Sequence, residues 1–233
     1  MGIRFTINGK EIYIHDTVVN SWIIVILLSI FAIVVNRKLK KANIDEKPTG
    51  LLNVVEILVE VLESLVKSVM GPTRMGFMPY IGTLALYLIC ANLFGLLGFT
   101  PPTSDYNVTL ALAIITFTLM HYNGIKSNGV KNYAKGFFEP MAFLFPINLI
   151  GEIATPISLS FRLFGNILSG SIIMALIYKG LNSVSMFLTP FVAPVFHFYF
   201  DVFSGLIQTL IFSMLTMLNI ANKMGDEPTE VIK

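Results

Sequence analysis

The 233-residue sequence has few charges, a single cysteine and only three histidines. Charged residues make up 13% of the chain, against about 25% in a typical soluble domain, whereas 55% are hydrophobic and the mean hydropathy is +0.74. Sixteen bases and 14 acids are too few to cover a soluble globule of this length. The composition excludes an ordinary cytosolic enzyme, a nucleic-acid-binding module and a disordered scaffold, and it predicts an integral membrane protein surrounded by the lipid bilayer.

The scarcity of cysteine and histidine also limits the chemistry. Cys90 alone cannot form a disulfide within the chain or a thiolate metal cluster, and His15, His121 and His197 do not have the spacing of metal ligands. The sequence contains neither a Gly-rich phosphate loop nor an obvious metal site. We therefore expect no metal, no cofactor and no catalysis by this chain alone. The net charge of +2 is too small to imply a polyanionic partner such as nucleic acid.

Five apolar stretches are long enough to cross a membrane, which takes about 20 residues. They cover residues 18–35, 79–99, 108–123, 137–178 and 185–222. The last two approach 40 residues, so they must tilt or kink, and five prolines supply places for a break. The sequence therefore predicts an all-α polytopic membrane protein, a single membrane domain with five transmembrane helices, the last two long and tilted or kinked.

The positions of the basic residues predict how the chain is oriented. The cluster 36–41 holds one arginine and three lysines directly after the first apolar stretch, which places that loop in the cytoplasm and residues 1–17 outside. The link 100–105 has no base and should lie outside, and the lysine-rich connection after residue 123 should lie inside. The tail 223–233 is then cytoplasmic, as expected for a multi-pass protein of a bacterial-type plasma membrane.

Residues 51–70 do not have the pattern of a span. Glu56, Glu60, Glu63 and Lys67 recur at i, i+4, i+7 and i+11, so they form one charged stripe on an otherwise apolar helix. Each charge at mid-bilayer would cost about 2.5–3.5 kcal/mol on insertion scales. We expect an amphipathic helix in the cytoplasmic interface; a transmembrane helix with a polar partner is the alternative.

Arg162 lies well inside the fourth apolar stretch, in the run Ser158–Asn166. A guanidinium group keeps its charge, so it must face water, a carboxylate or another protein. One interpretation is a structural salt bridge within the bundle, and the other is an electrostatic element of an ion path. Gly165, Ser169 and Gly170 add a small-residue surface, either for helix packing within the chain or for a separate subunit that slides past Arg162.

Other polar residues within the last two apolar stretches are candidate companions of Arg162. Asn148 and Glu152 are neighbours at i and i+4, but Glu152 lies about 15 Å from Arg162 along a helix, too far for a direct pair. In the last stretch His197, Asp201, Ser204 and Gln208 form a polar stripe. His197 fits a hydrogen-bonded anchor as well as a relay, whereas a carboxylate such as Asp201 is costly to bury without a purpose.

Two motifs carry a specific resemblance. The runs Ser158–Asn166 (SLSFRLFGN) and Gly205–Thr216 (GLIQTLIFSMLT) resemble subunit a of the F-type ATP synthase, and the five-span topology with an outside N-terminus is also that of the family. The resemblance implies that Arg162 is the stator charge facing the rotating ring of c subunits. It also implies peripheral-stalk b subunits as partners, and a chain that translocates ions but makes no ATP itself.

The resemblance assigns further positions. Asn166 and Gln208 match conserved polar neighbours of the arginine. Family members have an ionisable residue nine positions after the arginine and another seven before the glutamine; here these are Ser171 and Asp201, so Asp201 alone would serve that aqueous half-channel. Glu152 and Asn148 match polar channel positions more loosely. The coupling ion stays open between H⁺, the default, and Na⁺.

Two other functions remain as alternatives at this point. A secondary transporter would use Arg162 as a substrate or ion site, but such proteins commonly contain internal repeats and none is evident between the two halves of this chain. A purely structural membrane anchor would have no use for Arg162 and Asp201 at membrane depth.

Overall fold

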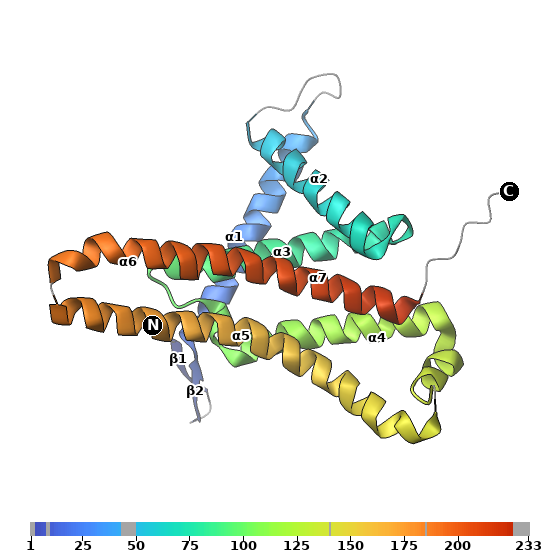
Figure 1. Cartoon of the computed structure of the whole chain (residues 1–233). Coiled ribbons are helices and arrows are strands. Elements are labelled where there is room, and N and C mark those ends of the chain that lie inside the picture. The colour runs from blue at the N-terminus through green and yellow to red at the C-terminus, as the bar shows by residue number, and fades with distance from the viewer. Residues whose placement is uncertain (1–2, 8–9, 43–49, 140, 185, 226–233) are drawn as a thin grey trace.

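The computed structural model describes residues 3–7, 10–42, 50–139, 141–184 and 186–225, and it is a helical bundle with one short hairpin (Figure 1). Strands β1 (Ile3–Ile7) and β2 (Lys10–Ile14) pair antiparallel within the segment 1–17 and were not predicted. Five helical segments are long and apolar enough to cross a membrane: 16–39, 72–97, 106–136, 142–183 and 189–224. The predicted polytopic helical fold with five spans is thus confirmed.

In the described part of the chain, seven α-helices make up the bundle. They are α1 (Asp16–Leu39), α2 (Leu51–Met70), α3 (Met78–Leu93), α4 (Tyr106–Gly136), α5 (Phe145–Val184), α6 (Thr189–His197) and α7 (Ser204–Met224). Short 3₁₀ turns precede or follow several of them, and a π-helix, Phe198–Phe203, joins α6 to α7. From α3 onward, consecutive spans run in opposite directions, so the beginning of α5 lies at the same end of the bundle as the last residues of α4 and α7 (Figure 1).

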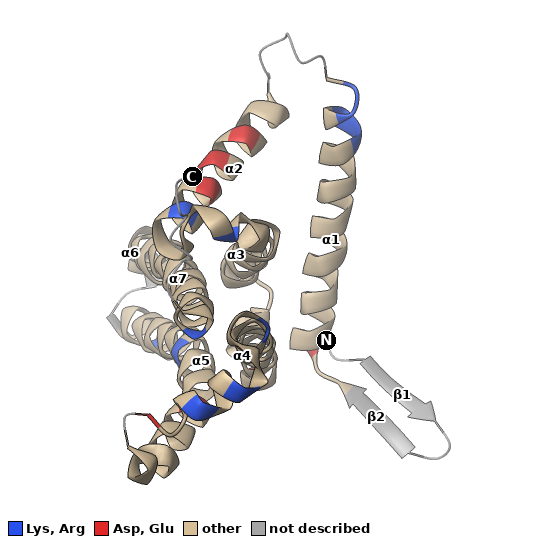
Figure 2. Cartoon of the chain, turned by 90° about the vertical axis from the view of Figure 1, so that its right-hand side faces the viewer, with Lys and Arg blue, Asp and Glu red and all other residues tan. Residues whose placement is uncertain are grey.

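The long helices lie across α1. In Figure 1, α5 and the α6–α7 pair run side by side, with α1 steeply inclined to both. Figure 2, turned by 90°, shows α3, α4, α5 and α7 nearly end-on while α1 lies in the plane of the picture. The 40 residues of α5 continue through the buried Pro156 without a break. This arrangement agrees with strong tilting of the two longest apolar stretches.

Apolar side chains form two cores between the helices. The first joins α1, α3, α5 and α7 around Ile24, Leu88, Leu163 and Phe212. The second joins α2, α3, α4 and α7 through residues that include Val66 and Met217. Large apolar residues also cover the outer surface, most densely on α1, which is the pattern of a protein whose solvent is lipid.

The helix α4 is longer than the apolar stretch predicted from the sequence, whereas the helix α2 has the predicted bounds. The helix α4 continues to Gly136, so the lysine-rich connection after residue 123 is helical, with a local break at Gly129, where φ is 76°. The helix α2 has the bounds of the charged stripe, is not among the five segments apolar enough to span, and pairs Glu63 with Lys67 at 2.6 Å. Figure 2 shows the acidic side of α2 near the end of the molecule where the basic end of α1 lies.

Candidate functional site

Arg162 lies on an exposed stripe of α5. Ser158, Arg162 and Ser169 are all exposed, and Gly165 completes the stripe at helical spacing. No hydrogen bond or ion pair of Arg162 occurs among the described residues. A side chain added at Gly165 would meet open space, whereas one at Gly170 would lie 3.8 Å from the Phe200 side chain. The two glycines therefore have different surroundings: Gly170 packs against another part of this chain, whereas Gly165 leaves the surface beside Arg162 uncovered.

A cavity of about 300 Å³, here called the Asp201 cavity, lies on one side of Arg162. Its lining includes Asn166 and Ser171 from α5, His197 and Asp201 from the last segment, and Asn92 from α3. Ser171 is nine residues beyond Arg162, about 14 Å along the helix. Three of the residues predicted from the sequence are thereby brought together at one polar opening.

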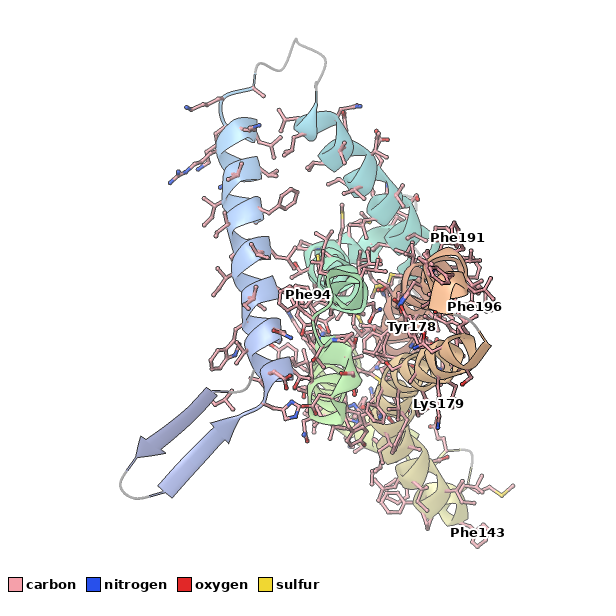
Figure 3. All side chains as sticks on the ribbon, turned by 90° about the vertical axis from the view of Figure 1, so that its left-hand side faces the viewer. Phe94, Phe143, Tyr178, Lys179, Phe191 and Phe196 are labelled. Carbon is pink, nitrogen blue, oxygen red and sulfur yellow. The ribbon has the colours of Figure 1, made fainter. Side chains whose placement is uncertain are left out.

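Asp201 belongs to a chain of hydrogen bonds. Its Oδ2 lies 2.5 Å from His197 Nδ1, and His197 Nε2 lies 2.7 Å from the hydroxyl of Tyr178. The first contact follows from the i, i+4 spacing, and Asp201 itself sits in the π-helix, a feature often found at functional sites. Sequence reasoning missed Tyr178, a residue of α5 (Figure 3), because it meets His197 of α6 only after the chain turns back between these two helices.

The remaining polar residues of α7 are largely buried. Ser204 donates to Asn166 Oδ1 at 2.9 Å and so connects α7 to α5. Gln208 is 5% exposed, and its Nε2 has no partner among the described residues. Neither Asn166 nor Gln208 is hydrogen-bonded to Arg162 in this structure, so their predicted role beside the arginine stays a prediction.

A buried network that the sequence did not indicate supports the Asp201 cavity. Asn92 donates to the Gly205 carbonyl at 3.1 Å and to Thr209 Oγ1 at 3.2 Å, and it accepts from Thr103 Oγ1 at 2.9 Å. Asn92 and Thr103 are 2% and 0% exposed. A side chain at Gly205 would lie 3.1 Å from Asn92 Cβ, so α3 and α7 approach closely at this point, directly after the π-helix.

A second cavity, of about 800 Å³ and here called the Glu152 cavity, lies toward the other end of α5. Glu152 lines it and forms an ion pair with Lys223 from the end of α7, while its second oxygen lies 3.8 Å from His121 Nε2. Asn148 also lines this cavity and donates to the carbonyls of Phe137 and Glu139, closing the connection between α4 and α5. Lys223 and His121 were not predicted here, because each is distant from Glu152 in sequence.

The three charged or polar positions on α5 follow one another along the helix. Glu152 lines the Glu152 cavity, Arg162 lies about 15 Å further along the helix, and Ser171 lines the Asp201 cavity. Among the described residues no group of three or more His, Cys, Asp or Glu side chains is arranged to hold a metal ion. The geometry thus offers two separate polar openings with a fixed positive charge between them.

Comparison with known proteins identifies the family. The family described as "ATP synthase A chain" matches residues 18–221. The chain is 34% identical to ATP synthase subunit a of Moorella thermoacetica over 90% of both chains, and 38% identical to that of Anoxybacillus flavithermus over 79% of this chain and 83% of the relative. It is also 34% identical to "ATP synthase subunit a, sodium ion specific" of Propionigenium modestum, over 90% of this chain and 74% of the relative. The chain therefore belongs to the ATP synthase A chain family, the family of subunit a.

Proposed function

We propose that this chain is the ion-translocating stator of an F-type ATP synthase, in which the Asp201 and Glu152 cavities are the two half-channels to a rotating c-ring. The family places the chain in the Fo membrane sector as a non-catalytic partner of the c-ring. That membership sets aside the secondary transporter and the structural anchor, and no feature of the fold favours either.

One observation carries the proposal: Arg162 is exposed, has no partner among the described residues and lies between two polar cavities. A carboxylate of a c subunit that passes this surface would pair with Arg162, because no described group of this chain does so. The open space beside Gly165 lets another helix approach Arg162 closely.

The fixed charge explains why ion flow must turn the ring. Arg162 favours the ionised form of a nearby carboxylate, so a c subunit releases its cation as it approaches Arg162. Arg162 also repels any cation that moves directly between the cavities. The cation instead enters through one cavity, travels with the ring and leaves through the other. The membrane potential supplies about 2.3 kcal/mol per charge per 100 mV for this transfer.

Replacement of Arg162 by Ala tests the proposal. The Arg162→Ala enzyme should assemble but lose ion-driven ATP synthesis by more than about a hundredfold, since the barrier to direct ion passage is removed. ATP synthesis in energised inside-out vesicles measures this effect. Lys179→Ala, which removes an exposed charge from the far part of α5, serves as the matched control. Coupled synthesis at the control level in the Arg162 variant would refute the stator role.

The coupling ion in this proposal is H⁺, with Na⁺ as the alternative because one similar relative is named as sodium ion specific. The polar groups of both cavities suit either cation. ATP hydrolysis by the assembled complex, measured with and without added Na⁺, decides between them. Stimulation by Na⁺ would identify Na⁺ rather than H⁺ as the coupling ion.

The proposed orientation places residues 1–17 outside, and α2 and the C-terminal tail in the cytoplasm, so the Glu152 cavity opens to the cytoplasm. The b subunits and lipid would cover the apolar surface away from Arg162. Single cysteines at exposed positions of the charged stripe of α2, such as Glu56 and Glu60, in a Cys90→Ala background should react with a membrane-impermeant maleimide only from the cytoplasmic side. Reaction from the outside would require a different topology.

A further inference from the structure

The backbone of Lys223 is held in place by residues of α4. Its carbonyl accepts a hydrogen bond of 2.8 Å from Asn128 Nδ2. A side chain added at Gly124 would lie 3.1 Å from the same carbonyl and 3.2 Å from Lys223 Cβ, so the glycine lets α4 approach α7 closely here. The last turn of α7 is therefore fixed against α4 at the residue that carries the ammonium group.

The residues that follow Lys223 are held in the same way. Ser127 Oγ donates to the carbonyl of Met224 at 3.0 Å, and Arg74 Nη2 donates to that of Gly225 at 2.5 Å. Hydrogen bonds to the final carbonyls are a common means of ending a helix firmly. Lys223 is thus a positioned side chain rather than a loose surface lysine.

The side chain of Lys223 points to Glu152. Its Nζ pairs with Glu152 Oε1 and lies 5.8 Å and 5.4 Å from the ring centroids of Tyr133 and Phe137. Rings at this distance favour a cation. The Glu152 side chain is 16% and the Lys223 side chain 28% exposed, so the pair remains open to the cavity it lines.

These contacts describe a cation-binding site that already contains a cation. A carboxylate and two aromatic rings surround one position in the Glu152 cavity, whose lining also includes asparagines, and the chain's own ammonium group occupies that position. A transported cation that reaches Glu152 must displace or bypass this group.

We propose that Lys223 is a tethered competitor of the transported cation, which sets how strongly the Glu152 cavity attracts cations. This inference rests on the proposed function, since it assumes that the cavity is the cytoplasmic half-channel. The pair has no net charge, and the other two charged residues of the lining, Lys135 and Glu139, also balance each other, so the cavity neither concentrates nor repels cations strongly. Removing Lys223 leaves a negative charge in the cavity, and removing Glu152 leaves a positive one. Competition therefore predicts opposite effects of the two changes on cation binding, whereas a purely structural role predicts the same effect.

The test is a double-mutant cycle. Lys223→Met keeps a long apolar side chain between the two rings but leaves Glu152 unpaired, whereas Glu152→Gln leaves the ammonium unpaired. The measurement is the cation concentration that gives half-maximal passive flux through F1-stripped inside-out vesicles, at low ionic strength and with a valinomycin potential that is negative inside. A pH-sensitive dye follows H⁺, and a sodium dye follows Na⁺ in a parallel series.

We expect opposite shifts. Lys223→Met should lower the half-saturating concentration roughly three- to tenfold, and Glu152→Gln should raise it by a similar factor, since one charge at this range changes the local cation concentration by about that much. The double variant should return close to wild type. The shifts should shrink in 1 M salt, where the screening length is only about 3 Å. Flux driven from the Asp201 side in right-side-out vesicles should keep its half-saturation.

Lys126→Gln is the matched control, because it removes one exposed lysine from the same end of α4 without touching the cavity lining. Equal losses of maximal flux in both single variants, with no recovery in the double, would show a structural latch and overturn the proposal. Where a single variant does not assemble, the exchanged pair Glu152→Lys with Lys223→Glu restores neutrality and should give half-saturation near wild type. Unchanged half-saturation in an assembled Lys223→Met complex, with coupling still lost in Arg162→Ala, would refute the competitor but not the stator.

Discussion

The two cavities beside Arg162 both contain an acid, but the acid has a different partner in each. Asp201 is bonded to an imidazole, which in turn is bonded to the Tyr178 hydroxyl. Glu152 is bonded to the ammonium of Lys223, and the imidazole of His121 lies at the longer distance of 3.8 Å. An imidazole both accepts and donates a proton, whereas an ammonium group only donates. If the two cavities are the half-channels proposed above, we expect the Asp201 cavity to pass a proton along its hydrogen bonds and the Glu152 cavity to balance charge.

The difference predicts unequal sensitivity to loss of the acid. Asp201 is the single acidic residue that lines its cavity among the described residues, so Asp201→Asn removes the only anionic group there. We expect passive ion flux to fall about a hundredfold, the lower end of the range for loss of a proton-transferring group, while the remaining flux stays coupled to ATP synthesis. Dye-quenching assays with stripped and intact vesicles measure both quantities. A smaller effect than that of Glu152→Gln would reverse the comparison, and an unchanged flux would remove Asp201 from the channel.

The two cavities also differ in how their walls are held. The Asp201 cavity rests on the buried Asn92 network, which Asn92→Ala would break, leaving the hydroxyls of Thr103 and Thr209 without this partner. Groups left unsatisfied in the interior cost about 1–3 kcal/mol each. Thermal denaturation of the purified complex should show a lower midpoint, with no such change in Thr83→Ala, an exposed residue of the same helix. Equal midpoints would mean that other contacts hold α7.

The smallest expected effect concerns the Tyr178 hydroxyl, which only supports the histidine. Tyr178→Phe removes one hydrogen bond worth about 0.5–1.5 kcal/mol and should slow flux through the Asp201 cavity roughly two- to tenfold. Tyr199→Phe is the control, because that exposed ring packs on Phe203. Initial rates of dye quenching measure both variants. If they behave alike, His197 acts without help from Tyr178.

Much of the fold was predictable because its signals are local. The five spans follow from apolar length alone, the charged stripe of residues 51–70 from a repeat of 3.6 residues, and the contact between His197 and Asp201 from one helical turn. The hairpin of β1 and β2 and the π-helix were not predicted, because each is a short departure from the surrounding pattern. The roles of Asn148, Asn166 and Gln208 stay predictions that the geometry leaves open.

The sequence by itself determined that the chain lies in a membrane and that a permanent charge, Arg162, is placed deep in an apolar stretch, because hydropathy and motif need no partner from elsewhere in the chain. Only the tertiary structure decided which groups line the two cavities on either side of that charge. Lys223 reaches Glu152 across 71 residues, and Asn92 reaches Thr209 across 117. Such contacts depend on how helices pack against one another, and no periodicity along the chain specifies them.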